Sequence, residues 1–277
     1  MVDNASTDGS ADGLEALSLP LTVIRNDENL GFGAACNQGA RGSAADYLLF
    51  LNPDTRLMRN SISVPVRFME RSENQAIGVC SIPLIGEDGQ VSRTCTRLPA
   101  PRHFFAKILG LDRLSPGRFP SHFMTEWDHA ESRDVDHVIG AFYLIRRSLF
   151  ERLSGFDARF FVYLEDLDLS YRVHAAGARV FFLTDASAYH KGGGTSERVK
   201  ATRLFYALRS RIQYGYKHFG WWGATSVMLA TLLLEPFTRI CLALTQRSFA
   251  PVKETLVGYA ALWRTLPQWI GNRTSDT

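Results

Sequence analysis

The sequence predicts an α/β fold, with one mixed, mostly parallel sheet flanked by helices and a C-terminal helical extension. Along residues 1–190, short apolar runs alternate with stretches of helical pattern, which is typical of βαβ units. The run at 47–51 is continuously apolar, the pattern of a strand buried on both faces. From residue 198 onward the strand-like runs stop, and 198–217 has the pattern of a basic helix rich in aromatic residues.

The first half of the chain supplies the clearest elements. Strands are predicted where apolar runs end at turn residues, and helices where small or amphipathic stretches lie between them. A turn at 86–89 is expected to join the two arms of a hairpin. The predicted strands are 21–24, 47–51, 76–85 and 90–96, and the predicted helices are 31–42 and 61–71.

The second half begins with a segment of poor periodicity. Residues 99–134 contain four prolines and scattered aromatics, so we expect a long functional loop with short helices. A helix at 167–176 begins on the acidic run 165–168 and ends at Gly177, with its acids at the end that the helix dipole favours. Strands at 138–145 and 180–183 and a short helix at 146–153 complete the prediction.

Charge is distributed unevenly. Residues 1–190 carry 19 Lys and Arg against 24 Asp and Glu, whereas residues 191–277 carry 12 against 4. A basic C-terminal third indicates an anionic partner, either a membrane or a nucleic acid. No nucleic-acid-binding motif accompanies it, so we expect no nucleic acid partner. The four cysteines form no C-x-x-C pair, which disfavours a zinc site or a disulfide framework and favours a reducing compartment.

The segment after residue 217 could contact a membrane. Residues 218–234 contain no Asp, Glu, Lys or Arg, but Glu235 and Arg239 follow, and a spanning helix needs about 20 apolar residues. Trp221 and Trp222, with basic residues on both flanks, favour a helix lying in the interface. The alternative is a buried helix pair that closes the α/β domain, and both interpretations stay open at this point.

Acidic residues follow three predicted strand or loop segments. Asp3 ends a short strand, Asp54 follows the strand at 47–51, and Glu165 and Asp166 open a late helix. Ligands of open α/β sheets bind at the carboxyl ends of strands, so these carboxylates could hold a divalent cation and supply a base. Each of them alone would more often be a turn residue or a helix cap. Their combination makes this edge the candidate site.

Other common site motifs are absent or incomplete. The segment 31–36 resembles a dinucleotide fingerprint, but Cys36 replaces the third glycine. The sequence has no Walker A motif, no G-x-S-x-G and no H-E-x-x-H, which disfavours P-loop enzymes, α/β-hydrolases and zincins. The glycines and hydroxyls of 192–196 could close over a diphosphate, and the alternative is an exposed linker.

Six short segments stand out in order along the chain. They are V-D-N-A-S-T-D-G-S at 2–10, N-L-G-F-G at 29–33 with Asn37, L-N-P-D-T at 51–55, G-F-D with F-F at 155–161, E-D-L-D-L at 165–169, and His190 with the glycine loop. Together they resemble glycosyltransferase family 2, the inverting nucleotide-sugar transferases. The likeness covers about residues 1–200 and is greatest to rhamnosyltransferase-like members that build O-antigen and other cell-surface polysaccharides. In that family a strand and a helix precede the segment at 2–10, and this chain is expected to lack both.

The resemblance implies a GT-A-type nucleotide-diphospho-sugar transferase fold and a set of site residues. Asp166 would be the general base of the E-D motif. Asp54, with Asn52 in the first place of a D-x-D-like motif, would hold Mg²⁺ or Mn²⁺, with His190 as an extra metal ligand. Asp3 would contact the base or ribose of the nucleotide. The donor-binding set implied in full is Asp3, Asn4, Asn29, Gly31, Asn52, Asp54, Gly193 and Thr195.

The chemistry of such a transfer agrees with these residue types. Displacement at the anomeric carbon releases a nucleoside diphosphate, whose developing charge a cation stabilises. The acceptor hydroxyl is a poor nucleophile and needs a carboxylate within reach. A base on the face opposite the leaving group gives inversion. Because Asp166 and Asp168 are two residues apart, they cannot share a helix face, and only one is expected to be the base.

The sequence therefore predicts an inverting glycosyltransferase domain at 1–197 and a basic helical region at 198–277 at the membrane. It would move a sugar, with rhamnose the best candidate, from a dTDP- or UDP-sugar to a glycan or polyprenyl-linked acceptor, at the cytoplasmic face of the cell membrane. One alternative is a catalytically inactive truncated homologue that binds a partner or a membrane. A sugar nucleotidyltransferase is a weaker alternative, because such enzymes carry a glycine-rich basic loop near the N-terminus that is absent here.

Overall fold

The computed structural model describes residues 1–192 and 200–271. The chain forms two compact units, of which the first comprises Met1–Arg97 with Trp127–Lys191 and the second comprises Leu98–Glu126 with Gly192–Thr277. The expected division at residue 197 differs from these units in two respects, one of which is that the first unit ends at Lys191. The segment 98–126 belongs with the C-terminal helices, because Phe104 packs against Phe219 with ring centroids 5.8 Å apart.

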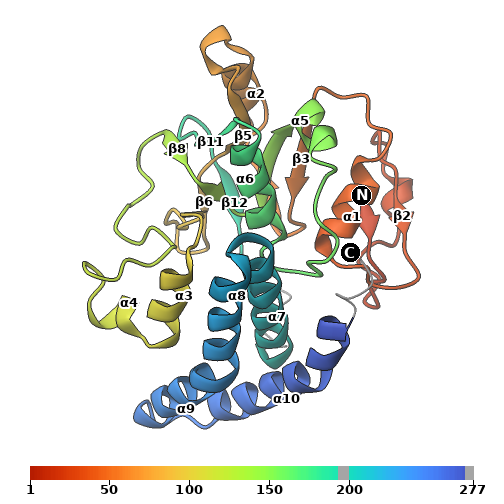
Figure 1. Ribbon diagram of the computed structural model, residues 1–277. Helices are drawn as coiled ribbons and strands as arrows, with labels where there is room; N and C mark the ends of the chain where they lie inside the picture. Colours follow the sequence, from red (N-terminus) through yellow and green to blue (C-terminus); the bar gives the residue numbers. More distant parts are fainter. Residues whose placement is uncertain (193–199, 272–277) are drawn as a thin grey trace. The chain divides into compact units, whose positions relative to one another are not determined.

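The first unit is built on a five-stranded sheet (Figure 1). Its strand order is β3 (Tyr47–Leu51), β10 (Phe142–Arg146), β5 (Ile77–Ser81), β11 (Arg179–Phe182) and β8 (Arg133–Val135). The α/β class and the mixed sheet are confirmed, but the expectation of a mostly parallel sheet is wrong. Within this five-stranded sheet only β5 and β11 pair in parallel. Strand β10 is antiparallel to β3 and β5, and β8 is antiparallel to β11.

The direction of β10 follows from where the chain enters it. Phe142, the first residue of β10, pairs with Leu51, the last residue of β3. The chain between β5 and β10 thus returns to the sheet at the edge where β3 ends, and it runs back along β3 in the opposite sense. No crossover helix is needed for such a connection. The sequence pattern gives the strand but not its direction.

In the described residues, three smaller sheets accompany the five-stranded sheet, where the sequence predicted a single sheet. β1 (Val2–Asp3) pairs in parallel with β2 (Ile24–Arg25), β12 (Ala188–His190) lies between β4 (Thr55–Leu57) and β6 (Leu84–Ile85), and β7 (Cys95–Thr96) pairs with β9 (His137–Val138). The expected hairpin of 76–85 with 90–96 is reduced to a single bridge between Ile85 and Val91, because β7 pairs with β9 instead.

Helices cover the sheet of the first unit. These are α1 (Phe32–Ala40), α2 (Ser63–Glu70), α5 (Arg147–Arg152) and α6 (Glu165–Ala175), with short 3₁₀ turns at η1 (Leu14–Ala16) and η2 (Ser72–Asn74). Every residue of β5 is buried, as expected for a central strand. The main core cluster is apolar and includes Met69, Ile77, Cys80, Ile82, Leu84, Phe142 and Leu144.

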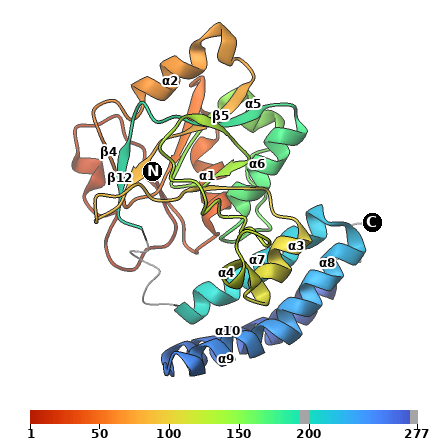
Figure 2. The ribbon, with the colours of Figure 1, turned by 90° about the vertical axis from the view of Figure 1, so that its left-hand side faces the viewer.

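The second unit is helical (Figure 2). The segment 98–126 contributes α3 (Pro101–Ile108) and α4 (Leu111–Leu114), which agrees with the expected loop with short helices. The C-terminal part contributes α7 (Lys200–His218), α8 (Gly220–Leu229), the π-helical turn η4 (Ala230–Leu234), α9 (Glu235–Thr245) and α10 (Ala250–Gly271). Its core is formed by Leu208, Ile212, Leu232, Tyr259 and Leu262. The predicted helical extension is confirmed.

A buried ion pair crosses this helical core. Glu235, at the start of α9, is 3% exposed and accepts hydrogen bonds from Arg211 of α7 and Arg239 of its own helix. Arg211 is itself 5% exposed and also contacts Thr231. Buried charges persist in proteins when they are paired and hydrogen-bonded in this way. Glu235, the acid that interrupts the apolar run in the sequence, is therefore internal to the unit, whereas the side chain of Arg239 is 36% exposed.

Candidate active site

Asp3 is the last residue of β1, at its carboxyl end. The side chain is 9% exposed, and its Oδ1 accepts a hydrogen bond of 3.0 Å from the backbone N–H of Ser6. Arg25 of β2 approaches Oδ2 at 3.6 Å. Hydrogen bonds from Ser6, assisted by the charge of Arg25, lower the pKa of Asp3. The carboxylate is thus ionised and fixed at the end of the strand.

Asn4 organises the neighbouring loop rather than pointing a free amide outward. Its Nδ2 donates to Asn29 Oδ1 at 2.9 Å and to the Gly31 carbonyl at 3.2 Å. Its Oδ1 accepts from Asn26 Nδ2 at 3.0 Å and from the Leu30 N–H at 3.1 Å. Asn4, Asn29 and Gly31, which the sequence placed together in the donor-binding set, do come together. The two asparagine amides hold the loop backbone in shape.

Gly31 allows a close approach between two loops. Its φ is +89°, and a Cβ at this position would lie 2.3 Å from the carbonyl oxygen of Phe161. Phe32 N–H donates to that same oxygen at 2.8 Å. Any side chain here would be strained by the backbone conformation and by the overlap. The glycine therefore fixes the loop after β2 against the segment that precedes α6.

Asp54 and His190 face one another across β4 and β12. Asp54 precedes β4, and the pairing of His190 with Thr55 carries the histidine to it. His190 Nε2 lies 3.2 Å from Asp54 Oδ1, and the two side chains are 11% and 30% exposed. The ring nitrogen is buried and makes no hydrogen bond of good geometry. A carboxylate and an imidazole with an unused nitrogen fit one side of a divalent cation site, since such ions take their remaining ligands from phosphates and water.

Within residues 1–192 and 200–271, no group of three or more His, Cys, Asp and Glu side chains could enclose a metal ion by itself. A cation at Asp54 and His190 would accordingly depend on the oxygens of a bound diphosphate. Asn52, the other residue of the D-x-D-like motif, donates its backbone N–H to the carbonyl of Ala141 at 3.2 Å. Gly193 and Thr195 lie outside the described residues.

Asp166 lies in the first turn of α6. Tyr163 and Leu164, just before the helix, both have positive φ values, of 68° and 67°. Such a conformation is uncommon for residues other than glycine and often occurs at functional sites. Asp166 Oδ2 accepts the Gly140 N–H at 2.7 Å, and Oδ1 accepts the Leu167 N–H at 2.8 Å. The carboxylate is thereby held at the N-terminus of α6, next to the start of β10.

Glu165 differs from its neighbour in its surroundings. It is 5% exposed, and its Oε2 is buried without a hydrogen-bond partner. Burial, with the nearby charge of Asp166, raises the pKa of Glu165 well above its usual range. The same two acids and burial raise the pKa of the Cys36 thiol to about 12, so this cysteine is unreactive. Asp166 is therefore the accessible acid of the pair.

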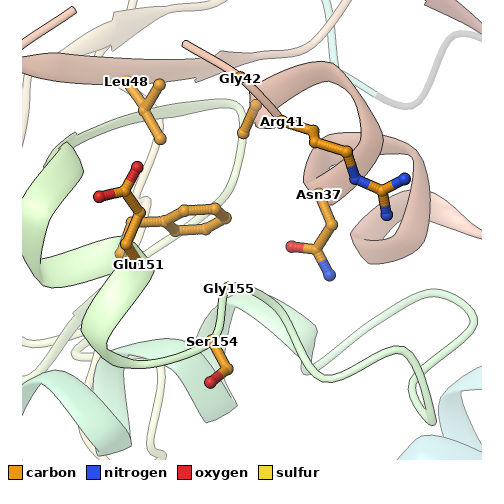
Figure 3. Close-up of a pocket in the computed structure, with 9 residues that line it drawn as sticks. Asn37, Arg41, Gly42, Leu48, Glu151, Ser154 and Gly155 are labelled. Atoms are coloured by element: carbon orange, nitrogen blue, oxygen red, sulfur yellow. The ribbon is translucent and has the colours of Figure 1, made fainter. Parts of the chain in front are cut away.

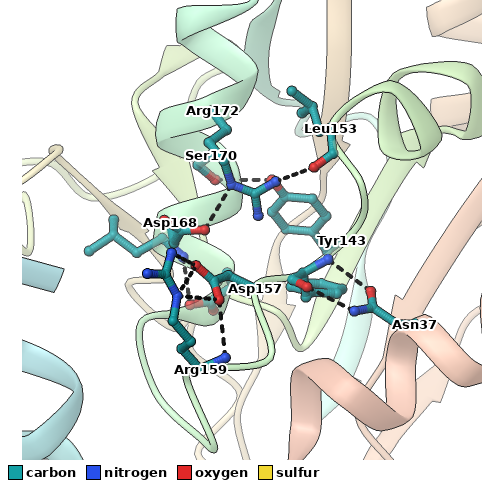
Figure 4. A network of polar contacts seen from close by, with 11 residues as sticks. Asn37, Tyr143, Leu153, Asp157, Arg159, Asp168, Ser170 and Arg172 are labelled. Carbon is teal, nitrogen blue, oxygen red and sulfur yellow. Dashed lines mark hydrogen bonds and ion pairs between the residues drawn. The ribbon is translucent and has the colours of Figure 1, made fainter. Parts of the chain in front are cut away.

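Asp168 has a structural role. It is fully buried, and its Oδ2 accepts a hydrogen bond of 2.8 Å from Arg172 Nε one turn later (Figure 4). Arg172 also donates to the Leu153 carbonyl at 2.7 Å, which ties α6 to the end of α5. This agrees with the expectation that only one of Asp166 and Asp168 acts as a base.

A hollow of about 400 Å³ opens elsewhere in the first unit, between the end of α1, β3 and α5 (Figure 3). Asn37, Arg41, Leu48, Glu151 and Ser154 line it, and none of the residues predicted for the site does. The amide of Asn37 is already engaged, since it bonds both the N–H and the carbonyl of Phe156.

Sequence reasoning missed three residues behind Asp166: His137, Tyr143 and Ser170. They come from β9, β10 and α6, and no motif or spacing connects them in the sequence. On its helix Ser170 has Leu167 and Val173 three positions away but Asp166 and His174 four positions away, so the sequence pattern did not single it out.

Comparison with known proteins matches a family model to the N-terminal part of the chain. The model, described as glycosyl transferase family 2, matches residues 1–154, more than half of the chain. The chain is 27% identical over 252 residues to an N-acetylglucosaminyl-diphospho-decaprenol L-rhamnosyltransferase of Mycobacterium tuberculosis, covering 81% of this chain and 76% of the relative. It is 25% identical over 205 residues to the rhamnosyltransferase WbbL of Escherichia coli K12, covering 73% of each chain.

A solved structure shares the fold. The mannosyltransferase PcManGT of Pyrobaculum calidifontis, determined with GDP-mannose and Mn²⁺, has a TM-score of 0.52 and 16% sequence identity, covering 96% of this chain and 76% of that one. The likeness supports the GT-A-type architecture that the sequence predicts.

Proposed function

Since the chain belongs to glycosyl transferase family 2 and is a glycosyltransferase, we propose that it transfers rhamnose with inversion from a nucleoside-diphosphate donor to a lipid-linked acceptor. Two relatives, most of whose length aligns with this chain, carry rhamnosyltransferase names. One of these names includes a decaprenyl-diphosphate-linked acceptor. The product would be a building block of a cell-surface polysaccharide. A dTDP-linked donor is favoured over a UDP-linked one.

The observation that supports this proposal most directly is that the segments carrying Asp166 and Asn52 both hydrogen-bond to the backbone at 140–141. Gly140 donates its N–H to Asp166, and the carbonyl of the next residue, Ala141, accepts the N–H of Asn52. Thr55 also donates its hydroxyl to that carbonyl, at 3.4 Å. The base candidate and the loop that carries Asp54 therefore flank the start of β10. A cation-bound diphosphate and an acceptor hydroxyl could be brought together there.

The residues present fit a divalent cation bound with its substrate. Asp54 and His190 would hold Mg²⁺ or Mn²⁺, which when bound supplies positive charge for the leaving diphosphate. Asp166 would accept the proton of the acceptor hydroxyl as its oxygen attacks the anomeric carbon. Asp3 would orient the nucleoside, and Asn4, Asn29 and Gly31 would shape its loop.

Calorimetric titration of the purified chain with dTDP, UDP and GDP, each with and without Mn²⁺, tests the donor site. We expect one nucleotide, dTDP, to bind more tightly with Mn²⁺ than without it. Its selectivity would also identify the donor class. If a chain shown by circular dichroism to be folded bound none of the three under either condition, the proposed donor site would be wrong.

We also propose that the second unit makes peripheral contact with the membrane. Gly220–Thr245 is one helix that is long and apolar enough to cross a membrane, and a third of its apolar window is buried within the protein. Trp222, Phe237 and Phe249 are 80%, 70% and 78% exposed. Basic residues such as Lys217, Arg247 and Lys253 accompany them. Exposed aromatics with basic neighbours are typical of helices that lie in the interface of an anionic bilayer.

Co-sedimentation with vesicles tests this contact. We expect the chain to pellet with vesicles that contain anionic phospholipid, and the variant carrying Trp222→Ser and Phe237→Ser to pellet much less. The matched control is Leu114→Ser with Leu19→Ser, since both leucines are strongly exposed but lie outside α8–α10. Equal binding of the aromatic variant and the control would contradict the proposal.

A further inference from the structure

Three buried polar side chains next to Asp166 contact one another: those of His137, Ser170 and Tyr143. His137 Nε2 lies 3.9 Å from Asp166 Oδ2, the oxygen that also accepts the Gly140 N–H. On the other side of the ring, His137 Nδ1 lies 2.9 Å from Ser170 Oγ. Ser170 Oγ in turn lies 3.1 Å from the hydroxyl of Tyr143, a contact that Figure 4 shows. His137 is 3% exposed, and Ser170 and Tyr143 are fully buried.

The chemistry of these groups fixes the direction of the hydrogen bonds. An ionised Asp166 can only accept, so the proton of a neutral His137 belongs on Nε2, facing the carboxylate. Nδ1 is then an acceptor, and Ser170 must donate its hydroxyl proton to it. Because that proton is used, the Ser170 oxygen accepts from Tyr143. The hydrogen bonds therefore run from Tyr143 through Ser170 to His137. The Nε2–H of His137 faces Asp166 at 3.9 Å, which is an electrostatic contact longer than a hydrogen bond.

The surroundings of His137 favour its neutral form. Burial lowers the pKa of His137, against the opposing influence of Asp166 and Asp136 and together with that of His174. Its hydrogen-bond partner Ser170 is uncharged, as is Tyr143 beyond it, whose pKa burial raises. A neutral ring holds the carboxylate through an N–H dipole. A charged ring would form an ion pair with the carboxylate and make it a weaker base.

We propose that His137, Ser170 and Tyr143 form a buried positioning chain that orients the carboxylate of Asp166 for proton abstraction from the acceptor. The inference rests on the proposed function, in which Asp166 is the base. The Gly140 N–H donates a hydrogen bond to one carboxylate oxygen, and the His137 ring faces the same oxygen at 3.9 Å, so that its N–H dipole acts on it electrostatically. None of the three residues needs to touch a substrate. A purely structural role, in which the side chains only satisfy one another's hydrogen bonds, is the competing explanation.

The test compares two replacements of His137. His137→Met fills a similar volume but removes the N–H donor, whereas His137→Gln can still place an amide N–H near the position of Nε2. We expect His137→Met to lower kcat about 10- to 100-fold, as for a small misplacement of a reacting group, with the KM of the donor within about twofold of wild type. His137→Gln should recover most of the loss. The assay is rhamnose transfer from dTDP-rhamnose to an N-acetylglucosaminyl-diphospho-polyprenol.

A pH profile supplies a readout that a structural role would not move. The acid limb of kcat should shift to higher pH in His137→Met, because the carboxylate loses a donor that favours its ionised form. The matched control is His103→Gln, a buried histidine of the second unit, whose Nδ1 accepts the Ala100 N–H. We expect this control to keep the wild-type kcat and acid limb per folded molecule.

The outcomes separate this inference from its premise. If Asp166→Asn retains kcat, the base assignment is wrong and the positioning chain loses its role. If Asp166→Asn is inactive while His137→Met keeps kcat and the wild-type profile, only the positioning chain is overturned. An equal loss of kcat in folded His137→Met and His137→Gln would also overturn it. Should His137→Met not fold, Ser170→Ala makes the same test, since it removes the donor to Nδ1 with little change in volume. This variant should have a lower kcat and an acid limb shifted to higher pH. A wild-type pH profile of Ser170→Ala would refute the positioning chain.

Discussion

Replacement of Asp166 by Asn is expected to lower kcat for sugar transfer about 10²- to 10⁴-fold, the range that a positioned general base contributes. The amide can keep the hydrogen bond from Gly140 but cannot accept the proton of the acceptor hydroxyl. Nucleotide binding should be nearly unchanged, because the change lies at the acceptor side of the transfer. Steady-state kinetics and calorimetric titration with dTDP and Mn²⁺ measure the two quantities separately.

Asp168→Asn is the matched control for this result. The residue is two positions away on the same helix, but its partner is Arg172, and the Asp168 side chain is fully buried while that of Arg172 is 20% exposed. Breaking one side of a buried pair costs about 3–5 kcal/mol of stability. We expect a lower midpoint of thermal unfolding with a kcat per folded molecule close to wild type. A parallel loss of catalysis and nucleotide binding in Asp166→Asn would contradict its assignment as the base.

The second large effect is expected from Asp54→Ala. Removing this carboxylate leaves His190 as the single side-chain ligand in the pair, so the gain in dTDP affinity that Mn²⁺ provides should fall about 10- to 100-fold. Affinity in the absence of metal should change little. Calorimetric titration at several Mn²⁺ concentrations measures both, and His190→Ala should show a smaller effect of the same kind.

Glu87→Ala is the control acid for Asp54. Glu87 lies near the same small sheet and pairs with Lys191 at 3.7 Å, but its side chain is 63% exposed and points away into solvent-screened surroundings. Its removal should leave the metal dependence as in wild type. An Asp54→Ala variant whose Mn²⁺ dependence equalled that of the wild type would rule out Asp54 as a ligand.

The sequence predicted local elements well, because local elements have local signals. The strand at 47–51 is observed with the same ends, and the acidic start and the Gly177 end of the helix containing Asp166 are close to their predicted positions. Apolar continuity and the charge preference of helix termini operate over a few residues, so they are visible in one sequence. The motifs also grouped Asn4 with Asn29 and Gly31, which contact one another between two neighbouring loops, and Asp54 with His190, which face one another.

Features that depend on distant connections were not predicted. The antiparallel direction of β10 depends on where the long segment between β5 and β10 returns to the sheet. Periodicity does not encode that position. The grouping of 98–126 with the C-terminal helices depends on packing such as that of Phe104 on Phe219. His137 and Ser170 are 33 residues apart and meet only because β9 packs beside α6. Such contacts follow from tertiary structure, and no local rule gives them.

The buried pair of Arg211 and Glu235 bears on how the chain could engage a bilayer. Insertion of the helix 220–245 as a separate span would have to break this pair and carry Glu235 into hydrocarbon, where a charged side chain is costly. The ion pair between Arg211 and Glu235 therefore stabilises the contact of the apolar helix with α7. The proposed membrane contact would then be monotopic and reversible, so that the protein could exchange between membrane-bound and free pools.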